Sequence, residues 1–128
     1  MIKHRIMEAH GIVVIEPISA LSADDFRDLT FSVDSYLAEH KTLHGLLIYA
    51  QNFPGWESFG GLLAHLNFVR NHHRKIECIA IVTDSPLGTF VPSLAKHFIS
   101  AQIKHFAYSK IEEALIWLKL NALSSVEN

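Results

Sequence analysis

The sequence has only one cysteine and no long apolar run, and both absences exclude classes of protein. A single thiol, Cys78, cannot form an internal disulfide framework and suits a reducing cytoplasm. No apolar segment approaches the roughly 18 residues that span a bilayer. The amino terminus, MIKHRIMEAH, is charged and lacks the apolar core of a secretory signal. We therefore expect a cytoplasmic protein without a membrane span.

An excess of positive charge is also missing. The net charge is −2 with histidine neutral, which offers no broad electrostatic footprint for nucleic acid. The basic stretch 70–75 (RNHHRK) is interpreted as the last turn of a helix, where cations meet the negative end of the helix dipole. We expect no nucleic-acid partner.

The 128 residues instead show an alternation of apolar strands and amphipathic helices, at a length typical of one domain. Residues 46–50 (LLIYA) and 76–82 (IECIAIV) lack polar alternation and each precedes a helical pattern, as in a parallel sheet covered by helices. The pattern predicts a single-domain α/β fold with a mixed, mostly parallel five-stranded sheet and about four helices, in the order β-β-α-β-α-β-α-β-α. Strands are predicted at 2–8, 12–16, 43–50, 76–82 and 102–106.

Turn and cap residues mark the predicted boundaries. Gly11 supplies a positive φ for a tight turn between the first two strands. Ser22 is predicted to cap the first helix, with acidic residues in its first turn. The second helix is predicted from about Glu57, the third opens at Ser85-Pro86, and a capping box of Ser109 and Glu112 opens the last. Residues 124–128 are predicted to be a frayed tail.

Three segments carry a resemblance to a known family: the loop 53–56 (FPGW), the strand 79–82 (IAIV) followed by Thr83-Asp84, and the ending 112–118 (EEALIWL). Together with the element order, they resemble the SpoIIAA-like branch of the STAS superfamily, small α/β domains related in fold to Sec14-type lipid carriers. The resemblance implies a SpoIIAA-like domain at residues 1–123. None of the three segments is a catalytic motif, so the resemblance implies a fold and not an activity.

Antagonist members of that superfamily carry a phosphorylatable serine at the start of the helix after the third strand. The matching segment here is Glu57-Ser58-Phe59-Gly60, in which Phe59 replaces a small residue. A phosphate on Ser58 would be stabilised by the free N–H groups of a helix start. A plain helix cap is the simpler interpretation of the same serine. A phospho-regulated anti-sigma-factor-antagonist switch at Ser58 is therefore an alternative function.

Nine histidines raise the question of a metal site. His65 and His72 share a helix face, but the two turns between them amount to about 10 Å, too far for one ion. No His-x₃-His pair exists, and no second cysteine can complete a zinc site. We interpret the histidines as surface or capping residues and expect no metal and no cofactor.

Catalytic motifs are equally scarce. The sequence has no Gly-x-Ser-x-Gly elbow and no phosphate-binding Gly-x-x-x-x-Gly-Lys loop. Cys78 lies in mid-strand, where a thiol is buried and inert. A triad built from Ser58 or Ser85 and a distant histidine stays open, because triads are recognised by geometry. We expect no enzyme, with a small hydrolase as a further alternative.

The loop 51–56 (QNFPGW) is the part of the sequence that folding explains least. Ligands of parallel sheets sit at the carboxyl ends of the strands, and large aromatic residues there line pockets or contact patches. We expect a small apolar ligand or a protein partner at the carboxyl ends of the third and fourth predicted strands. Aromatic residues would supply buried area, while Asn52, Asp84 and helix-start amides orient a polar end. The candidate residues are Asn52, Phe53, Trp56, Ser58, Asp84, Leu87 and Phe90. A homodimer is compatible with a free edge strand, although nothing in the sequence specifies one.

Overall fold

The protein is described here by a computed structural model that covers residues 1–86 and 101–127. Its core is a five-stranded sheet in the order β1-β2-β3-β4-β5, in which β1 is antiparallel to β2 and the other three pairs are parallel. The strands are β1 (Ile2–Met7), β2 (Ile12–Pro17), β3 (Leu43–Tyr49), β4 (Ile76–Val82) and β5 (Gln102–Phe106). The predicted mixed five-stranded α/β fold is confirmed.

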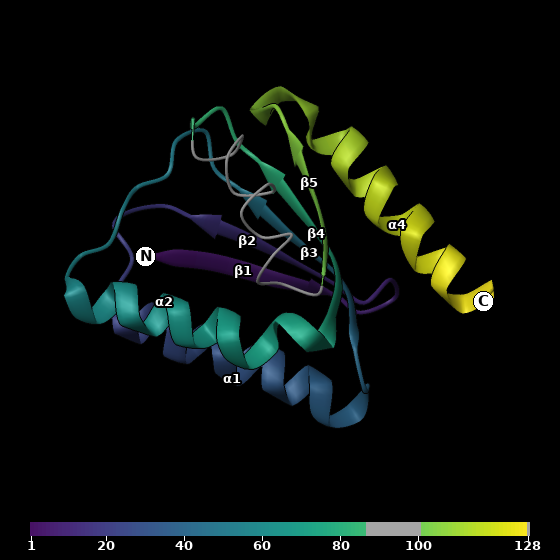
Figure 1. The fold of residues 1–128 in the computed structure, drawn as a ribbon, viewed down its shortest axis with the longest axis horizontal. Coiled ribbons are helices and arrows are strands. Elements are labelled where there is room, and N and C mark those ends of the chain that lie inside the picture. Colours follow the sequence, from purple (N-terminus) through teal and green to yellow (C-terminus); the bar gives the residue numbers. More distant parts are fainter. Residues whose placement is uncertain (87–100, 128) are drawn as a thin grey trace.

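Three α-helices are described: α1 (Ala23–Glu39), α2 (Phe59–His72) and α4 (Ile111–Glu127). Two 3₁₀ turns precede β4 and α4, namely η1 (His73–Lys75) and η2 (Tyr108–Lys110). The fourth helix that the sequence predicts after Ser85-Pro86 falls on residues outside the described range. Helices α1 and α2 lie on one face of the sheet and α4 lies on the other (Figure 1). The described part therefore has three layers, with the sheet in the middle.

Local signals explain where the elements begin. Ser22 caps α1 in a capping box, in which its hydroxyl accepts from the Asp25 N–H at 3.2 Å and Asp25 accepts from the Ser22 N–H at 2.9 Å. Gly11 has a φ of +65° in the turn between β1 and β2, as predicted.

The start of α4 differs from the sequence prediction. In place of the capping box at Ser109 and Glu112, η2 runs directly into α4, and the Tyr108 N–H donates to Asp84 Oδ1 at 3.0 Å. The carboxylate at the end of β4 thus stabilises the start of the last helical segment. Helix α4 extends to Glu127, and residues 122–127 contain no glycine or proline that would stop a helix.

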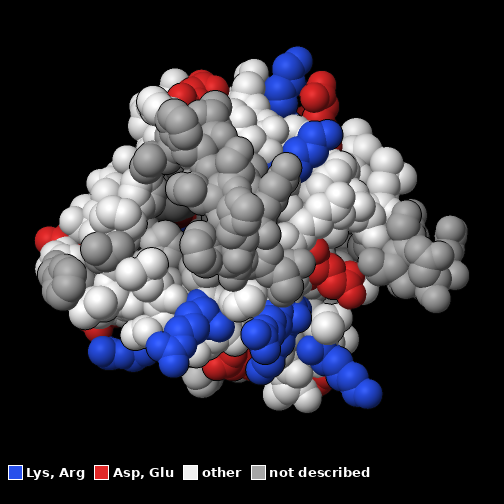
Figure 2. Space-filling model, in the orientation of Figure 1, with Lys and Arg blue, Asp and Glu red and all other residues white. Residues whose placement is uncertain are grey.

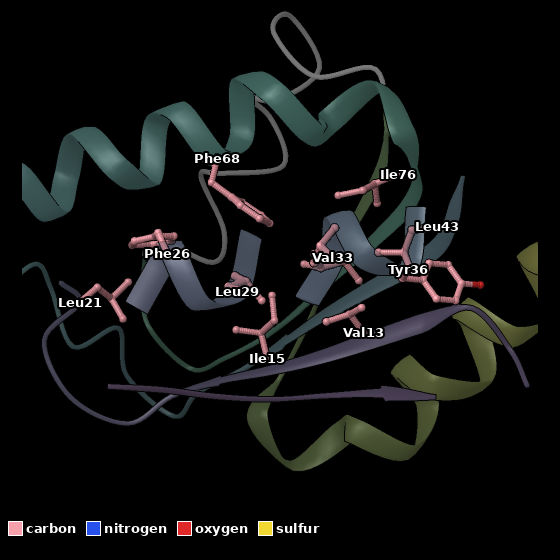
Figure 3. Close-up of a cluster of buried hydrophobic side chains, with 11 residues drawn as sticks. Val13, Ile15, Leu21, Phe26, Leu29, Val33, Tyr36, Leu43, Phe68 and Ile76 are labelled. Atoms are coloured by element: carbon pink, nitrogen blue, oxygen red, sulfur yellow. The ribbon is translucent and has the colours of Figure 1, made fainter. Parts of the chain in front are cut away.

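Buried side chains form one cluster on each face of the sheet. The cluster under α1 and α2 includes Phe26, Val33 and Phe68, which point toward the sheet from both helices (Figure 3). The cluster under α4 includes Leu47 and Leu118, both fully buried. Because the two faces take alternate residues of the same strands, β3 and β4 are apolar on both sides and show no polar alternation.

Charged side chains of both signs occur on the surface. Figure 2 shows Lys and Arg side chains interspersed with Asp and Glu side chains around the edge of the face in view. No helix in the described part of the chain is long and apolar enough to cross a membrane.

Candidate functional site

A cavity of about 370 Å³ lies on the α1/α2 face of the sheet, and we call it the α2 cavity. Its sheet side is made of aliphatic side chains that β2, β3, β4 and β5 direct toward the helices. Its helix side is made largely of side chains from α1 and α2, among them several aromatic rings. The aliphatic side chains on the sheet side are Ile15, Leu46, Ile48, Ile79, Ile81 and Ile103.

The rings on the helix side of the α2 cavity are in contact with one another. The Phe26 ring stacks on the His65 ring with centroids 4.9 Å apart, and it lies 6.3 Å from the Phe68 ring. The Phe68 ring in turn stacks on His72 at 4.4 Å. This series of rings follows one face of α2, because His65, Phe68 and His72 are three and four residues apart. The side of the cavity is therefore formed by supported rings, which fixes its shape.

Trp56 lines the α2 cavity and contacts two of its other aromatic residues. Its indole N–H donates to His65 Nδ1 at 3.2 Å, and its ring meets the Phe53 ring edge-on with centroids 5.0 Å apart. The loop that carries both aromatics is attached to the segment before α1, since the Leu21 N–H donates to the Gly55 carbonyl and the Glu57 N–H donates to the Leu21 carbonyl, both at 2.8 Å. Trp56 remains 39% exposed, so it faces solvent as well as the cavity.

The structure brings together only part of the predicted site. Phe53 and Trp56 both line the α2 cavity. Asn52 is exposed and does not line it, and Asp84 is exposed and engaged with the Tyr108 N–H. Ser58 is exposed and caps α2, its hydroxyl accepting from the Gly61 N–H at 3.3 Å. The other two candidates, Leu87 and Phe90, lie outside the described residues.

Two histidines of α2 belong to the cavity, and their interpretation as surface or capping residues was wrong. His72 is only 4% exposed, with Nδ1 2.7 Å from the Phe68 carbonyl oxygen and Nε2 2.8 Å from Asp34 Oδ1 on α1. Both partners are hydrogen-bond acceptors, so each ring nitrogen of His72 has a polar partner. This pair links α1 to α2.

His65 is in the opposite situation. Its Nδ1 accepts a hydrogen bond from Trp56, and burial lowers the pKa of His65, which favours the neutral ring. The seven-residue spacing of His65 and His72, with Phe68 and Val69 between them on the same helix face, is the sequence signal that marks both as inward-facing.

Polar groups near the carboxyl ends of β3 and β4 hold the two strand ends together. The Thr83 hydroxyl donates to the Gln51 carbonyl and accepts from the Ser85 N–H, both at 3.1 Å. The His105 ring lies with Nε2 2.8 Å from the Thr83 carbonyl oxygen. Thr83 and Ser85 also line the α2 cavity, so its lining includes two hydroxyl residues as well as aromatic rings.

The described residues show no group of three or more His, Cys, Asp or Glu side chains that could hold a metal ion. Cys78 is buried in the cluster under α4, away from the α2 cavity, and burial together with the nearby Glu77 carboxylate raises the pKa of its thiol. A thiol with a raised pKa is a poor nucleophile at neutral pH.

The comparisons with solved structures and with family models agree on the fold. A search of curated proteins gave no significant match. A crystal structure of an uncharacterized protein from the DUF3478 family with a SpoIIAA-like fold, from Shewanella loihica PV-4, superposes with a TM-score of 0.71 at 21% sequence identity, over 91% of this chain and 93% of that one. The family model for SpoIIAA-like proteins matches residues 12–119, as the three sequence segments predicted. The chain belongs to the SpoIIAA-like family.

Proposed function

We propose that the protein is a non-catalytic module that binds a small apolar ligand in the α2 cavity. The observation that carries the proposal is the cavity itself: about 370 Å³, bounded by aliphatic side chains of the sheet and by aromatic rings of the helices. This volume lies in the range of roughly 300–1,000 Å³ that is typical of ligand pockets. The few polar side chains at its edge, among them His65 and Ser85, would orient the ligand rather than react with it.

A small molecule fits this cavity better than a protein partner does. The described lining of the cavity comes from the sheet on one side and from α1 and α2 on the other, an arrangement that suits a small ligand held between two layers. An apolar ligand of matching size would gain roughly 25 cal/mol for each Å² of apolar surface removed from water. Trp56, which is 39% exposed, is the residue through which a ligand or a partner first meets the cavity.

Binding of the uncharged fluorescent probe N-phenyl-1-naphthylamine tests the proposal. We expect saturable binding with an increase in probe emission, because the probe moves from water into apolar surroundings. Ile79→Trp should abolish binding, since Ile79 lies on the sheet side of the cavity and the larger side chain fills it. Ile116→Trp is the matched control, because Ile116 is 56% exposed on α4, on the opposite face of the sheet.

Two results would contradict the proposal: no binding to the wild-type protein, or equal binding to the Ile79→Trp variant and the wild type. Trp56→Ala should weaken the probe at least tenfold in a protein that remains folded. Native mass spectrometry of protein from its own host, before and after mild denaturation, would then show whether a natural ligand is retained and give its mass.

Regulation by phosphorylation at Ser58 is the second candidate. The observation in its favour is that Ser58 is exposed at the N-terminus of a 14-residue helix whose first turn contains no acidic residue. A phosphate there would meet free N–H groups and the positive end of the helix dipole. Mass spectrometry of the native protein should find an added phosphate on Ser58, and consistent absence of the modification would remove this candidate.

A further inference from the structure

We infer that the ligand of the α2 cavity carries a neutral hydrogen-bond acceptor, such as a ketone, ester or quinone carbonyl, which accepts from the Nε2–H group of His65. This inference rests on the proposed function, since it names the chemistry of the ligand for the same cavity. The inference makes His65, which lies on α2 and not on the loop of Phe53 and Trp56, a residue that determines ligand specificity.

The donor character of Nε2 follows from the hydrogen bond at the other ring nitrogen. The indole N–H of Trp56 can only donate, and it lies 3.2 Å from His65 Nδ1. Nδ1 must therefore present a lone pair, and the single proton of the neutral ring is on Nε2. Trp56 thus fixes the tautomer of His65 and makes Nε2–H a donor in the ligand-free protein.

His65 is also held in place as a donor. Its ring stacks on Phe26 with an interplanar angle of 17°, and it lines the α2 cavity beside Trp56. Within residues 1–86 and 101–127, no hydrogen bond engages Nε2. A donor that is already oriented loses little entropy when a ligand binds, so an acceptor at this point adds directly to affinity.

The neighbouring polar side chains are engaged elsewhere. His72 uses both ring nitrogens, on the Phe68 carbonyl and on Asp34. The Thr83 hydroxyl is shared between Gln51 and Ser85. The hydroxyl of Ser85 is the rival donor, because Ser85 also lines the cavity.

Neutrality of the acceptor follows from the charges around the cavity. A carboxylate would be buried against a neutral imidazole, and burial of a charge without a partner is costly. His72 does not change this, because its two ring nitrogens already lie within hydrogen-bond distance of the Phe68 carbonyl oxygen and of Asp34 Oδ1. Desolvation lowers the pKa of His65, so the ring does not readily become a cation that could pair with an anionic ligand.

Three probes with the same naphthalene body test the inference: 2-acetylnaphthalene with a neutral acceptor, 2-ethylnaphthalene with none, and 2-naphthoate with a charged one. Trp56 reports binding by fluorescence in a Trp117→Phe background, since the chain has two tryptophans and Trp117 lies on α4, on the other face of the sheet. We expect the ketone to bind about two- to tenfold more tightly than the hydrocarbon, the range that one net hydrogen bond gives. Naphthoate should bind more weakly than either.

Two substitutions assign the donor. His65→Phe keeps a ring against Phe26 and removes the N–H. The variant should therefore bind the ketone and the hydrocarbon with about equal affinity. Ser85→Ala should leave the preference intact. The reverse pattern, with the preference lost only in Ser85→Ala, would overturn the assignment to His65.

The remaining outcomes separate this inference from the proposed function. Equal binding of ketone and hydrocarbon to the wild type would refute the acceptor while leaving apolar ligand binding intact. Failure of all three probes to bind would overturn both. Nitrogen-15 NMR of the unliganded protein checks the tautomer independently of any ligand: Nε2 should carry the proton and Nδ1 should not, and the opposite assignment would end the inference.

Discussion

The two faces of the sheet are packed in different ways, although they share the same strands. Under α4 the contacts are close: Gly45 allows α4 to approach, and a Cβ atom built at this position would lie 3.0 Å from Leu118 Cδ2. Ala80 and Ala114 are fully buried on the same face. On the α1/α2 face, the described isoleucines of the sheet and aromatic rings of the helices line a cavity of about 370 Å³. Small residues bring a helix onto a sheet, whereas large residues on both sides keep the helix away and leave a cavity.

This difference assigns different roles to the two faces. Interiors are normally packed to the density of organic crystals, and an unfilled volume forfeits contacts. The α4 face follows that rule and contributes mainly to stability. The α2 face is less closely packed, next to the loop that carries the exposed Trp56. Loose packing lowers stability, and such a loss is expected where a ligand binds. Substitutions on the two faces should therefore have separable effects on folding and on binding.

Leu118→Ala should have the largest effect on stability. Leu118 is fully buried under α4, and truncation of a buried leucine costs about 2–5 kcal/mol of unfolding free energy. Urea denaturation followed by circular dichroism measures the change, and N-phenyl-1-naphthylamine should bind to the folded variant as it does to the wild type. Ile116→Ala, at a 56% exposed position two residues earlier, should stay within about 0.5 kcal/mol. A large loss of probe affinity in Leu118→Ala would show that the two faces are not independent.

Gly45→Ala should have the second-largest destabilising effect. The added methyl group would meet Leu118 Cδ2 at 3.0 Å and Ile12 Cγ1 at 3.3 Å, so these buried side chains or the elements that carry them must shift. Overpacking of this kind typically costs about 1–3 kcal/mol. The same denaturation experiment measures it. No change in stability would mean that α4 moves away from the sheet without cost and that the α4 face is not close-packed.

Ile48→Phe should stabilise the protein, in contrast to the two substitutions above. Ile48 lies on the sheet side of the α2 cavity, where the larger ring can enter existing space. Cavity-filling substitutions commonly add about 0.5–2 kcal/mol to stability. Ile48→Phe should at the same time weaken the binding of N-phenyl-1-naphthylamine. A destabilised variant that still binds the probe would show that the cavity is not open at Ile48.

The strands and the ends of several helices could be predicted from the sequence because their signals are local. The run Ile76–Val82 is apolar apart from Glu77 and lies between helical patterns, and Ser22 with Asp25 forms a cap within four residues. The cavity could not be predicted, because it depends on how far α2 lies from the sheet. Phe53 and Trp56 were found through their place at a strand end. His65 and His72 were missed, since metal-ligand spacing was tested and their shared inward face was not.

The smallest effect is a pH dependence confined to the cavity face. Burial lowers the pKa of His65 below its ordinary value of 6.5, so the unfolded chain takes up a proton at a pH where the folded protein does not. The contribution of His65 to stability is complete above about pH 6.5 and is lost as the pH falls from there toward the lowered pKa of the folded state. Between pH 7.5 and pH 5.5, the wild type should lose more stability than His65→Phe. Leu118→Ala loosens only the other face and should keep the wild-type dependence. Equal losses in the wild type and His65→Phe would mean that His65 is not desolvated, and the cavity would then be wetter than its lining indicates.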